Sequence, residues 1–561
     1  MASNIEFKST TDPEIIQKLY RLCSTEWSGK LAPEKFVEGL TKTHVEYLKK
    51  GGKLSAYYLE DTTTGEIVAS TCVKHIKAFY KPADKSSSIS SIPDPSLFGV
   101  NNATGLLISF VFVHPDYRKK GLANLCVSKA IEATEDDIIK EKLDSSDEAV
   151  LDNFKKMSIY DGSDEVDRQL ANYYLSKEYV WLLYSGVSTY YERFGFKAYP
   201  LDFYEIPETL LTEEIETVIE KLIQSLNEGK TGEHPKHIGK KLRFLRGDNG
   251  ADQEIIQFIL QNKELSILTE INKLVFHLEL QSDRKSSTSL TNMSSILAMS
   301  KLGSNTALSS ITESSNNESP LSPASPGSGA GAGTGLGRRQ SGVHNQTTPK
   351  FAIKPTYLDY QWNASMEKEF FGSSDNEKAN EFANIQGAIV TNELQQRSYY
   401  VLWSSLKGQF YITGMGEIQF QGIPTIPNGR RRRASSLSSL NELGGFNFQD
   451  IEILIYAAIH VAKNRLHPTE KVYVSVNDLP DEFPDTILFD FFTNYLPASS
   501  QSLEEKPGEG VTKIDPLQVK VLLNTDAAKS EIKVLPMLKK FGSKKCEFDL
   551  DWESNGMWCW G

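Results

Sequence analysis

The stretch "VFVHPDYRKKGLA", Val111 to Ala123, joins a strand pattern to a helix pattern in the N-terminal part of this chain. Its first residues end the apolar run "GLLISFVFV", which predicts a buried strand, and Pro115 predicts a turn. We expect a helix to begin near Gly121, whose missing side chain allows a ligand to approach the backbone closely. Helix N-termini expose unpaired amides, and the basic residues 118–120 add three charges there. The stretch therefore predicts a phosphate-binding corner; the alternative is a plain turn with solvated basic residues.

Strand and helix patterns alternate around this corner through residues 1–206. Before it come the strand pattern "IEFKS", two helices that begin at Pro13 and Pro33, and a hairpin made of "KLSAYYLE" and "IVASTCVKHI". After it come a helix over 122–133, a long charged insertion over about 135–177, the buried strand "EYVWLLYS", the helix "GVSTYYERF" and the strand "GFKAYP". This order predicts an α/β (α+β) domain built on a mixed sheet flanked by helices.

The rest of the chain divides by composition. Residues 207–282 have the pattern of a helical connecting segment, and residues 283–350 are rich in Ser, Gly and Pro, which predicts a low-complexity, disordered linker or insertion. Residues 351–561 predict a second α/β domain, interrupted by a disordered loop over 421–446. The sequence shows no internal repeat, and this second domain has no phosphate-binding corner of its own.

Composition narrows the class of protein. A chain of 561 residues exceeds what one core usually organises, and its net charge of −12 disfavours DNA or RNA as a partner. The five cysteines are scattered without metal-ligand spacing, which indicates a reducing compartment and no metal site. No apolar run is long enough for a membrane span. We expect a cytoplasmic protein, with the nucleus as the alternative.

Two motifs in the N-terminal part resemble those of one enzyme superfamily. Residues Val113 to Ala123 read Val-x-Pro-x-x-Arg-x-x-Gly-x-Ala and resemble the acetyl-CoA motif of the GNAT superfamily of acyl-CoA N-acyltransferases. Downstream, "VWLLYSGVSTYYERFGFKAY" resembles the GNAT segment in which a strand diverges from its neighbour and a Tyr-bearing helix precedes Gly-Phe. This match places Tyr191, four residues before Gly195, where the family usually carries its general acid.

The resemblance implies acetyl-CoA as the co-substrate, without a metal. Backbone groups of the strand would pair with the pantetheine arm, and amides of the corner would hold the pyrophosphate. The residues so implied are Val111, Phe112, Val113, Arg118, Lys119, Lys120, Gly121, Leu122, Ala123 and Asn124.

An amine acceptor also requires a base, because an amine with a pKa of about 10.4 is almost entirely protonated at neutral pH. Glu178, Glu192 and carboxylates of the second domain are the candidates for that base, and the sequence does not choose among them. His114 and the C-terminal carboxylate beyond "NGMWCW" are weaker alternatives.

The whole chain resembles the fungal lysine N6-acetyltransferase family of lysine catabolism. This implies acetyl transfer to the side-chain amine of free L-lysine, with the second domain covering the acceptor site. Two alternatives stay open: acetylation of another amine, either a polyamine or a protein lysine, and a catalytically weak protein that binds acetyl-CoA for regulation.

Two serines follow arginine pairs inside the low-complexity segments. Ser341 ends "RRQS" and Ser435 follows the run "RRRRA", a spacing that suits a basophilic kinase. We expect both to be phosphorylation sites; the alternatives are a solvated loop and, for the four-arginine run, a localisation signal.

Overall fold

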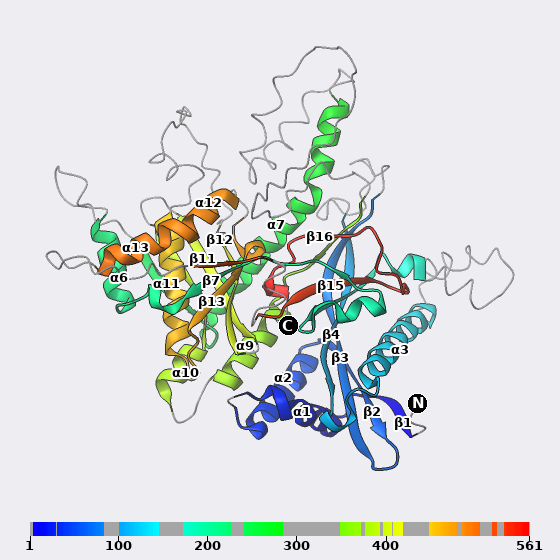
Figure 1. The fold of residues 1–561 in the computed structure, drawn as a ribbon. Helices are drawn as coiled ribbons and strands as arrows, with labels where there is room; N and C mark the ends of the chain where they lie inside the picture. Colours follow the sequence, from blue (N-terminus) through cyan, green and yellow to red (C-terminus); the bar gives the residue numbers. More distant parts are fainter. Residues whose placement is uncertain are drawn as a thin grey trace, which may run out of the picture.

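Two mixed β-sheets, each flanked by helices, organise the chain (Figure 1). This confirms the predicted α/β class with mixed sheets flanked by helices. The computed structural model describes residues 4–29, 31–83, 100–144, 172–225, 240–283, 348–371, 376–392, 397–406, 408–418, 448–480, 485–504, 519–523 and 532–559.

The first sheet has the strand order β1-β2-β3-β4-β5-β15-β6, and β9 pairs with both β3 and β16. Pairing is antiparallel from β1 to β4, parallel between β4 and β5, and antiparallel from β5 through β15 to β6. The strands are β1 (Ile5–Thr10), β2 (Lys53–Asp61), β3 (Glu66–Lys81), β4 (Asn101–Val113), β5 (Tyr179–Ser185), β6 (Lys197–Ala198), β9 (Lys350–Ile353), β15 (Leu535–Lys540) and β16 (Asp551–Trp552).

Side chains that alternate along β3 give this sheet two apolar faces. Val73 packs toward α3 (Leu122–Asp144), whereas Cys72 packs toward α1 (Pro13–Trp27) and α2 (Pro33–Lys49). The sheet is therefore buried on both sides, as the near-continuous apolar sequence of β5 predicts.

The second sheet has the order β14-β7-β13-β12-β11-β10-β8. Its strands are β7 (Phe203–Pro207), β8 (Lys240–Arg246), β10 (Ile385–Asn392), β11 (Arg397–Leu406), β12 (Gln409–Ile418), β13 (Lys471–Ser475) and β14 (Lys520–Leu522). Its flanking helices are α6 (Ile215–Ser225), α7 (Gly250–Asp283), α9 (Tyr357–Phe371), α10 (Glu377–Ala383), α11 (Phe448–Asn464), α12 (Asp485–Asp490) and α13 (Leu496–Glu504).

The two sheets repeat one topology. Read from β8, the second sheet is antiparallel through β10, β11 and β12, parallel between β12 and β13, and antiparallel through β7 to β14. The first sheet shows the same six pairings in the same order. In each half a helix, α3 or α11, connects the two strands that pair in parallel. The chain therefore contains two copies of one fold pattern, which the sequence did not reveal.

The two halves also exchange a strand. β15, from the C-terminal part of the chain, lies between β5 and β6 of the first sheet. β7, which follows β6 in the chain, lies between β13 and β14 of the second sheet. Each sheet is thus completed by a strand whose sequence belongs with the other half.

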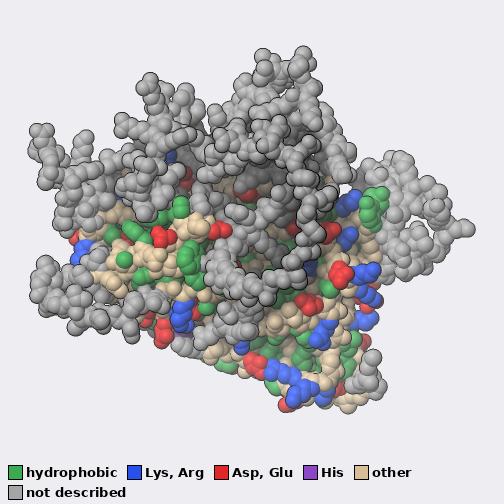
Figure 2. Space-filling view, turned by 45° about the horizontal axis from the view of Figure 1, so that its top comes forward, with side chains coloured by type: hydrophobic (Ala, Val, Ile, Leu, Met, Phe, Trp, Pro, Cys, Tyr) green, Lys and Arg blue, Asp and Glu red, His purple; other side chains and the backbone are tan. Residues whose placement is uncertain are grey.

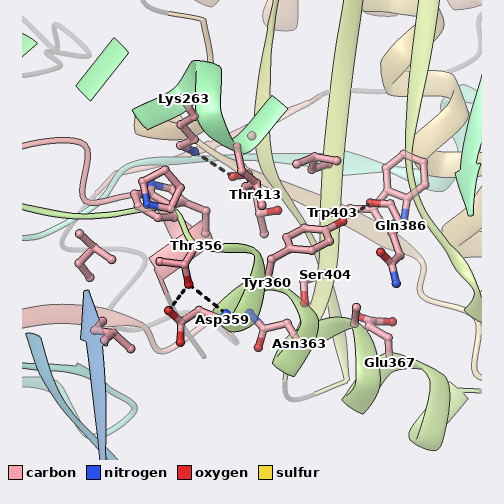
Figure 3. Close-up of a pocket in the computed structure, with 18 of the residues that line it drawn as sticks. Lys263, Thr356, Asp359, Tyr360, Asn363, Glu367, Gln386, Trp403, Ser404 and Thr413 are labelled. Atoms are coloured by element: carbon pink, nitrogen blue, oxygen red, sulfur yellow. Dashed lines mark hydrogen bonds between the residues drawn. The ribbon is translucent and has the colours of Figure 1, made fainter. Parts of the chain in front are cut away.

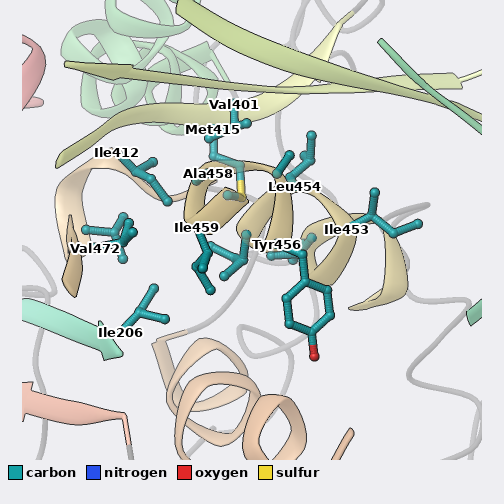
Figure 4. Close-up of a cluster of buried hydrophobic side chains, with 14 of the residues drawn as sticks. Ile206, Val401, Ile412, Met415, Ile453, Leu454, Tyr456, Ala458, Ile459 and Val472 are labelled. Atoms are coloured by element: carbon teal, nitrogen blue, oxygen red, sulfur yellow. The ribbon is translucent and has the colours of Figure 1, made fainter. Parts of the chain in front are cut away.

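A large core fills the second half around α11. Residues 449–459 and 461–462 of this helix are all buried, and they pack between the second sheet and helices α12 and α13 (Figure 4). Leu454 and Ile459 face Met415 and Val472, which come from two different strands. A helix that is apolar almost all round is buried in this way.

The predicted domain boundaries at 206 and 351 remain predictions. The strand pairing adds that residues 350–353, 535–540 and 551–552 belong to the first sheet. The segment 207–282 differs from a purely helical connection, because it contains β8, an edge strand of the second sheet. Apart from its ends, the linker 283–350 lies outside the described residues, as does the whole loop 421–446.

Candidate acyl-CoA site and acceptor pocket

The parallel strands β4 and β5 part halfway along their length. They pair only from Thr104 with Tyr179 to Leu107 with Leu182. Beyond that point β5 continues beside β15, while residues 108–109 and 112–113 of β4 pair with β3 alone among the described strands. One backbone edge of this part of β4 is therefore open to a partner.

A bulge in β4 marks the parting point. Phe110 has a positive φ of 52°, which is unusual for a residue with a bulky side chain. The pairing with β3 shifts register here, between Ser70 and Cys72. A bulge re-aims the strand it interrupts, which accounts for the divergence of β4 from β5.

The open edge leads directly into the corner that the sequence predicts. A short 3-10 turn, η3 (Pro115–Tyr117), follows β4, and Lys119 and Gly121 have φ values of 62° and 78°. The first hydrogen bond of α3 runs from the Leu125 amide to the Gly121 carbonyl at 3.1 Å. The amides of residues 122–124 therefore have no partner within the helix, and they point toward its N-terminus.

Gly121 leaves this corner open. A Cβ placed on it would meet no atom within 4 Å, so its backbone faces free space rather than packed side chains. Partner-free amides beside such a space, with basic side chains next to them, fit a pyrophosphate. The geometry of the corner thus suits a phosphate group.

Arg118 connects this corner to the end of α1. One guanidinium nitrogen lies 2.7 Å from the Glu26 carboxylate, and Nε donates to the Val113 carbonyl at 3.2 Å. The guanidinium also lies 5.5 Å from the centre of the Phe112 ring. The ion pair is largely solvent-exposed, so it leaves Arg118 able to exchange its partner.

Tyr191 lies beside the gap between the parting strands. It belongs to the 3-10 helix η4 (Ser188–Phe194) and is 8% exposed. Its cluster contains Ile108 of β4 and Leu183 of β5, the first residues of each strand beyond their parallel pairing. Burial raises the pKa of the Tyr191 hydroxyl above its usual range, because desolvation disfavours the tyrosinate.

The candidate bases Glu178, Glu192 and His114 lie in different surroundings. Glu178 precedes β5, at the end of the strand remote from the gap, and its carboxylate is 2.6 Å from Lys142. Five residues of extended strand, about 16 Å, separate it from Leu183. Glu192 follows Tyr191 and is exposed. The His114 ring accepts a hydrogen bond from the Asp116 amide at 3.3 Å, which gives it a role in the turn.

A pocket lies between the two sheets, on the face of the first sheet opposite α3 (Figure 3). Its lining includes Leu107, where β4 and β5 part, and it reaches β11 and β12 of the second sheet. Helix α9 forms one wall and presents Asp359, Asn363 and Glu367 at four-residue spacing along one face. The pocket therefore adjoins the gap on the side away from α3.

Lys74 and Asp359 form an ion pair in the wall of this pocket. Lys74 Nζ lies 3.2 Å from Asp359 Oδ1, and its side chain is 2% exposed. The ammonium also lies 4.7 Å from the centre of the Tyr47 ring and 4.9 Å from that of Trp362. Burial lowers the pKa of Lys74, an effect that the Asp359 charge opposes. The pair connects β3 to α9.

Asp359 is held by hydroxyl donors as well. Tyr47 Oη donates to Asp359 Oδ1 at 3.0 Å, and Thr356 Oγ1 donates to Oδ2 at 2.5 Å. Further along α9, Arg465 lies 2.6 Å from Glu367, and both side chains are buried. Each carboxylate of α9 in the pocket is thus matched by a buried cation from another element.

Sequence reasoning missed this pocket, although a signal was present. Lys74 interrupts an otherwise apolar strand, and the α9 acids recur with the period of one helix face. A charge inside a buried strand requires a partner, but the sequence does not indicate that the partner comes from residue 359.

The two predicted phosphorylation sites are not part of the described structure. Ser341 and Ser435 lie outside the described residues.

Within the described ranges, no helix is long and apolar enough to cross a membrane, and no group of three His, Cys, Asp or Glu side chains could hold a metal ion. On the face in Figure 2, Lys and Arg side chains lie among Asp and Glu side chains.

Comparisons with known proteins give structural likenesses alone. No family model and no curated protein matches the chain. A conserved protein of unknown function from Enterococcus faecalis, described as a probable N-acyltransferase, is 8% identical over 96% of this chain and 73% of its own, with a TM-score of 0.36. A GCN5-related N-acetyltransferase from Kribbella flavida is 8% identical over 95% and 71%, with a TM-score of 0.34.

A shorter likeness covers 36% of this chain. It is to Arabidopsis thaliana NAA60 in complex with acetyl-CoA, at 15% identity, over 88% of that chain and with a TM-score of 0.18. All three TM-scores are below 0.5, so the case for a function rests on this chain's own residues.

Proposed function

We propose that this protein is an N-acetyltransferase of the GNAT type that moves the acetyl group of acetyl-CoA to a primary amine, the side-chain amine of free L-lysine. The observation that carries the proposal is the open edge of β4 over residues 108–113, which leads into unpaired amides at the start of α3. A pantetheine arm needs such an edge, and a pyrophosphate needs such amides.

Each part of the donor has a matching group. Backbone groups of Val111, Phe112 and Val113 pair with the pantetheine amides. The amides of residues 119–124 hold the pyrophosphate, because the Arg118 amide already donates to the Pro115 carbonyl at 3.2 Å. The side chains of Arg118, Lys119 and Lys120 add charge. The thioester then lies between the parting strands, next to Tyr191.

The reaction forms one bond and breaks another. The neutral amine attacks the thioester carbon, the C–N bond forms, and the C–S bond breaks to release the CoA thiolate. Tyr191 donates its hydroxyl proton to the thiolate, and the tyrosinate so formed takes up the proton that the new amide nitrogen loses, which restores the phenol. A carboxylate or an ordered water removes the proton of the incoming ammonium. Glu192, next to Tyr191 in the chain, and the α9 acids that line the pocket with Leu107 are the candidates for this base.

The acceptor enters from the pocket between the sheets. This pocket adjoins the parting point at Leu107 and is bounded by residues of the second half. Its wall contains groups of both charges, Asp359 and Glu367 beside Lys74 and Arg465. These features support a small polar amine as the acceptor, and free lysine is such an amine.

The test is mass spectrometry of L-lysine incubated with the protein and acetyl-CoA. The proposal expects N6-acetyl-lysine to accumulate with time. Acetylation of spermidine or of a lysine-containing peptide, but not of L-lysine, would indicate that a polyamine or a protein lysine is the acceptor. Acetyl-CoA that binds without any product would support the regulatory alternative.

The cytoplasmic or nuclear location and the kinase sites also remain proposals. Ser341 and Ser435 would carry phosphate after incubation with a basophilic kinase and ATP. Peptide mapping that finds both serines unmodified would remove the kinase as a partner.

A further inference from the structure

The C-terminal segment bridges β12 and β13 of the second sheet where those strands part. Residues 554–559 include the 3-10 turn η9 (Met557–Cys559), which lies against β12. The Met557 amide donates to Asp478 Oδ2 at 2.6 Å, and Asp478 belongs to η7 (Val476–Asp478), directly after β13. The Met557 side chain is buried in one cluster with Tyr411 and Tyr473.

That position corresponds to the proposed acyl-CoA gap of the first half. β12 and β13 pair in parallel over a short stretch only, from Phe410 with Val472 to Ile412 with Val474. The parallel pairing of β4 with β5 is similarly short, since it covers four residue pairs. β12 also shifts register directly after its paired stretch, opposite Leu402 and Trp403. In the second half, the mouth of the equivalent gap is therefore occupied by the chain itself.

The same segment reaches the first half. Tyr184, two residues beyond the last parallel pair of β5, donates its hydroxyl to the Gly556 carbonyl at 2.8 Å. Trp558 lines the pocket between the sheets together with Leu107. Lys263 Nζ lies 4.5 Å from the centre of the Trp558 ring and 3.4 Å from the Thr413 carbonyl. The segment is thus fixed on both sides and forms part of the pocket wall.

We propose that residues 554–559 close the second gap and shape the acceptor pocket, with Trp558 as a specificity-determining contact for the acceptor. Each chain then binds a single acetyl-CoA, in the first half. This inference rests on the proposed function, because it assumes that the pocket receives the amine and that the gap beside β4 receives acetyl-CoA.

Gly556 allows a sharp test of this inference. A Cβ at this position would overlap the Asp478 carboxylate, whose side chain is fully buried. Gly556→Ala must therefore shift either the segment or the Asp478 carboxylate that holds it. Gly250→Ala is the matched control, since a Cβ there meets no atom within 4 Å and Gly250 has no positive φ. Trp558→Leu is a second variant that removes the indole and leaves the backbone unchanged.

The experiment combines calorimetric titration with acetyl-CoA and steady-state kinetics with L-lysine. We expect one acetyl-CoA per chain in the unmodified protein, with a Kd that both variants keep within about twofold. We expect Gly556→Ala and Trp558→Leu to raise the KM for L-lysine by about tenfold or more, the size of effect that a changed pocket wall produces. Gly250→Ala leaves both quantities unchanged.

The outcomes separate the two proposals. Two acetyl-CoA molecules per chain, or an unchanged KM for L-lysine in both variants, would overturn the inference while leaving the acetyltransferase proposal intact. No acetyl-CoA binding by the unmodified protein would overturn both. If Gly556→Ala fails to fold, Trp558→Leu alone decides the role of the wall.

Discussion

Gly121 and Gly65 have similar backbone conformations but lie in different parts of the fold. Their φ values are 78° and 72°, and a Cβ on either would meet no atom within 4 Å. Gly121 precedes α3 at the proposed pyrophosphate site, whereas Gly65 lies in the turn between β2 and β3. The strain that alanine brings to a left-handed residue is therefore equal at both, about 1 to 2 kcal/mol.

Gly121→Ala and Gly65→Ala should thus lower stability alike but differ in ligand binding. We expect Gly121→Ala to weaken acetyl-CoA binding by about tenfold, because the methyl group enters the space that the phosphate needs. Gly65→Ala should leave the Kd unchanged. Calorimetry and thermal unfolding of both variants check this, and an equal Kd for the two would remove Gly121 from the site.

Lys74 illustrates a buried charge that depends on its partner. Lys74→Met leaves Asp359 without its cation, so we expect it to lower the free energy of unfolding by about 2 kcal/mol or more. Lys74→Met combined with Asp359→Asn should recover part of this loss.

Lys53→Met serves as the control for this prediction, because Lys53 and Glu141 form an ion pair at 2.9 Å with both side chains more than half exposed. Its effect on stability should be near zero. Urea unfolding of the four proteins gives the comparison, and equal losses for Lys74→Met and Lys53→Met would contradict the role given to burial.

At the scale of elements, α11 combines an apolar sequence with buried acids. Glu452 is fully buried, and Tyr495 Oη donates to its carboxylate at 3.1 Å. Burial raises the pKa of Glu452 from 4.5 to about 7. The unfolded chain releases this proton above pH 4.5, whereas the folded chain keeps it up to about pH 7.

The difference in the pKa of Glu452 between the folded and unfolded chain determines how stability changes with pH. Between these two pH values the folded state binds more protons, so the contribution of Glu452 to stability falls as the pH rises. Glu452→Gln should therefore stabilise the protein at pH 8, by about 3 kcal/mol at most, and much less at pH 5. Thermal unfolding at both pH values measures this, and a difference between variant and parent that does not change with pH would contradict the shift.

Elements whose pattern is local could be predicted from the sequence. The helices from Pro13 and Pro33 begin where their prolines predict; at the first, Asp12 also accepts a hydrogen bond from the Glu14 amide. β4, the corner and α3 follow in the predicted order, because each depends on neighbouring residues. The helix that carries Tyr191 is a 3-10 helix, a distinction that the pattern "STYYERF" does not encode.

Partners distant in sequence could not be predicted. β15 has the apolar pattern of a strand, but nothing local assigns it to the edge of β5, more than 300 residues earlier. The Lys74–Asp359 ion pair and the packing of α9 against the pocket could not be predicted for the same reason, because their partners are also distant in sequence. The strand, turn and helix start of the corner, which come from one continuous stretch, could therefore be predicted, and the pocket, which is built from both halves, could not.

At the scale of the whole molecule, the exchanged strands make the halves depend on each other. β15 supplies Met537 and Leu538, both fully buried, to the first sheet. It also supplies Lys539, 3.4 Å from the Glu135 carboxylate of α3. Without β15, β5 would expose a backbone edge and apolar side chains.

Residues 1–206 produced alone should therefore show no cooperative thermal transition. Co-expression with residues 207–561 should restore a stable complex, because it supplies β15 in trans. Calorimetry of the fragment and of the complex checks this. A cooperative transition in residues 1–206 alone would show that the N-terminal part is an independent domain.

A crystal structure of the protein with CoA would locate the donor relative to the open edge of β4. We expect the pantetheine arm along residues 108–113 of β4, the pyrophosphate at the amides of 119–124 beside the Arg118 side chain, and residues 554–559 still in place between β12 and β13. CoA bound between β12 and β13, or away from the open edge of β4, would contradict the account.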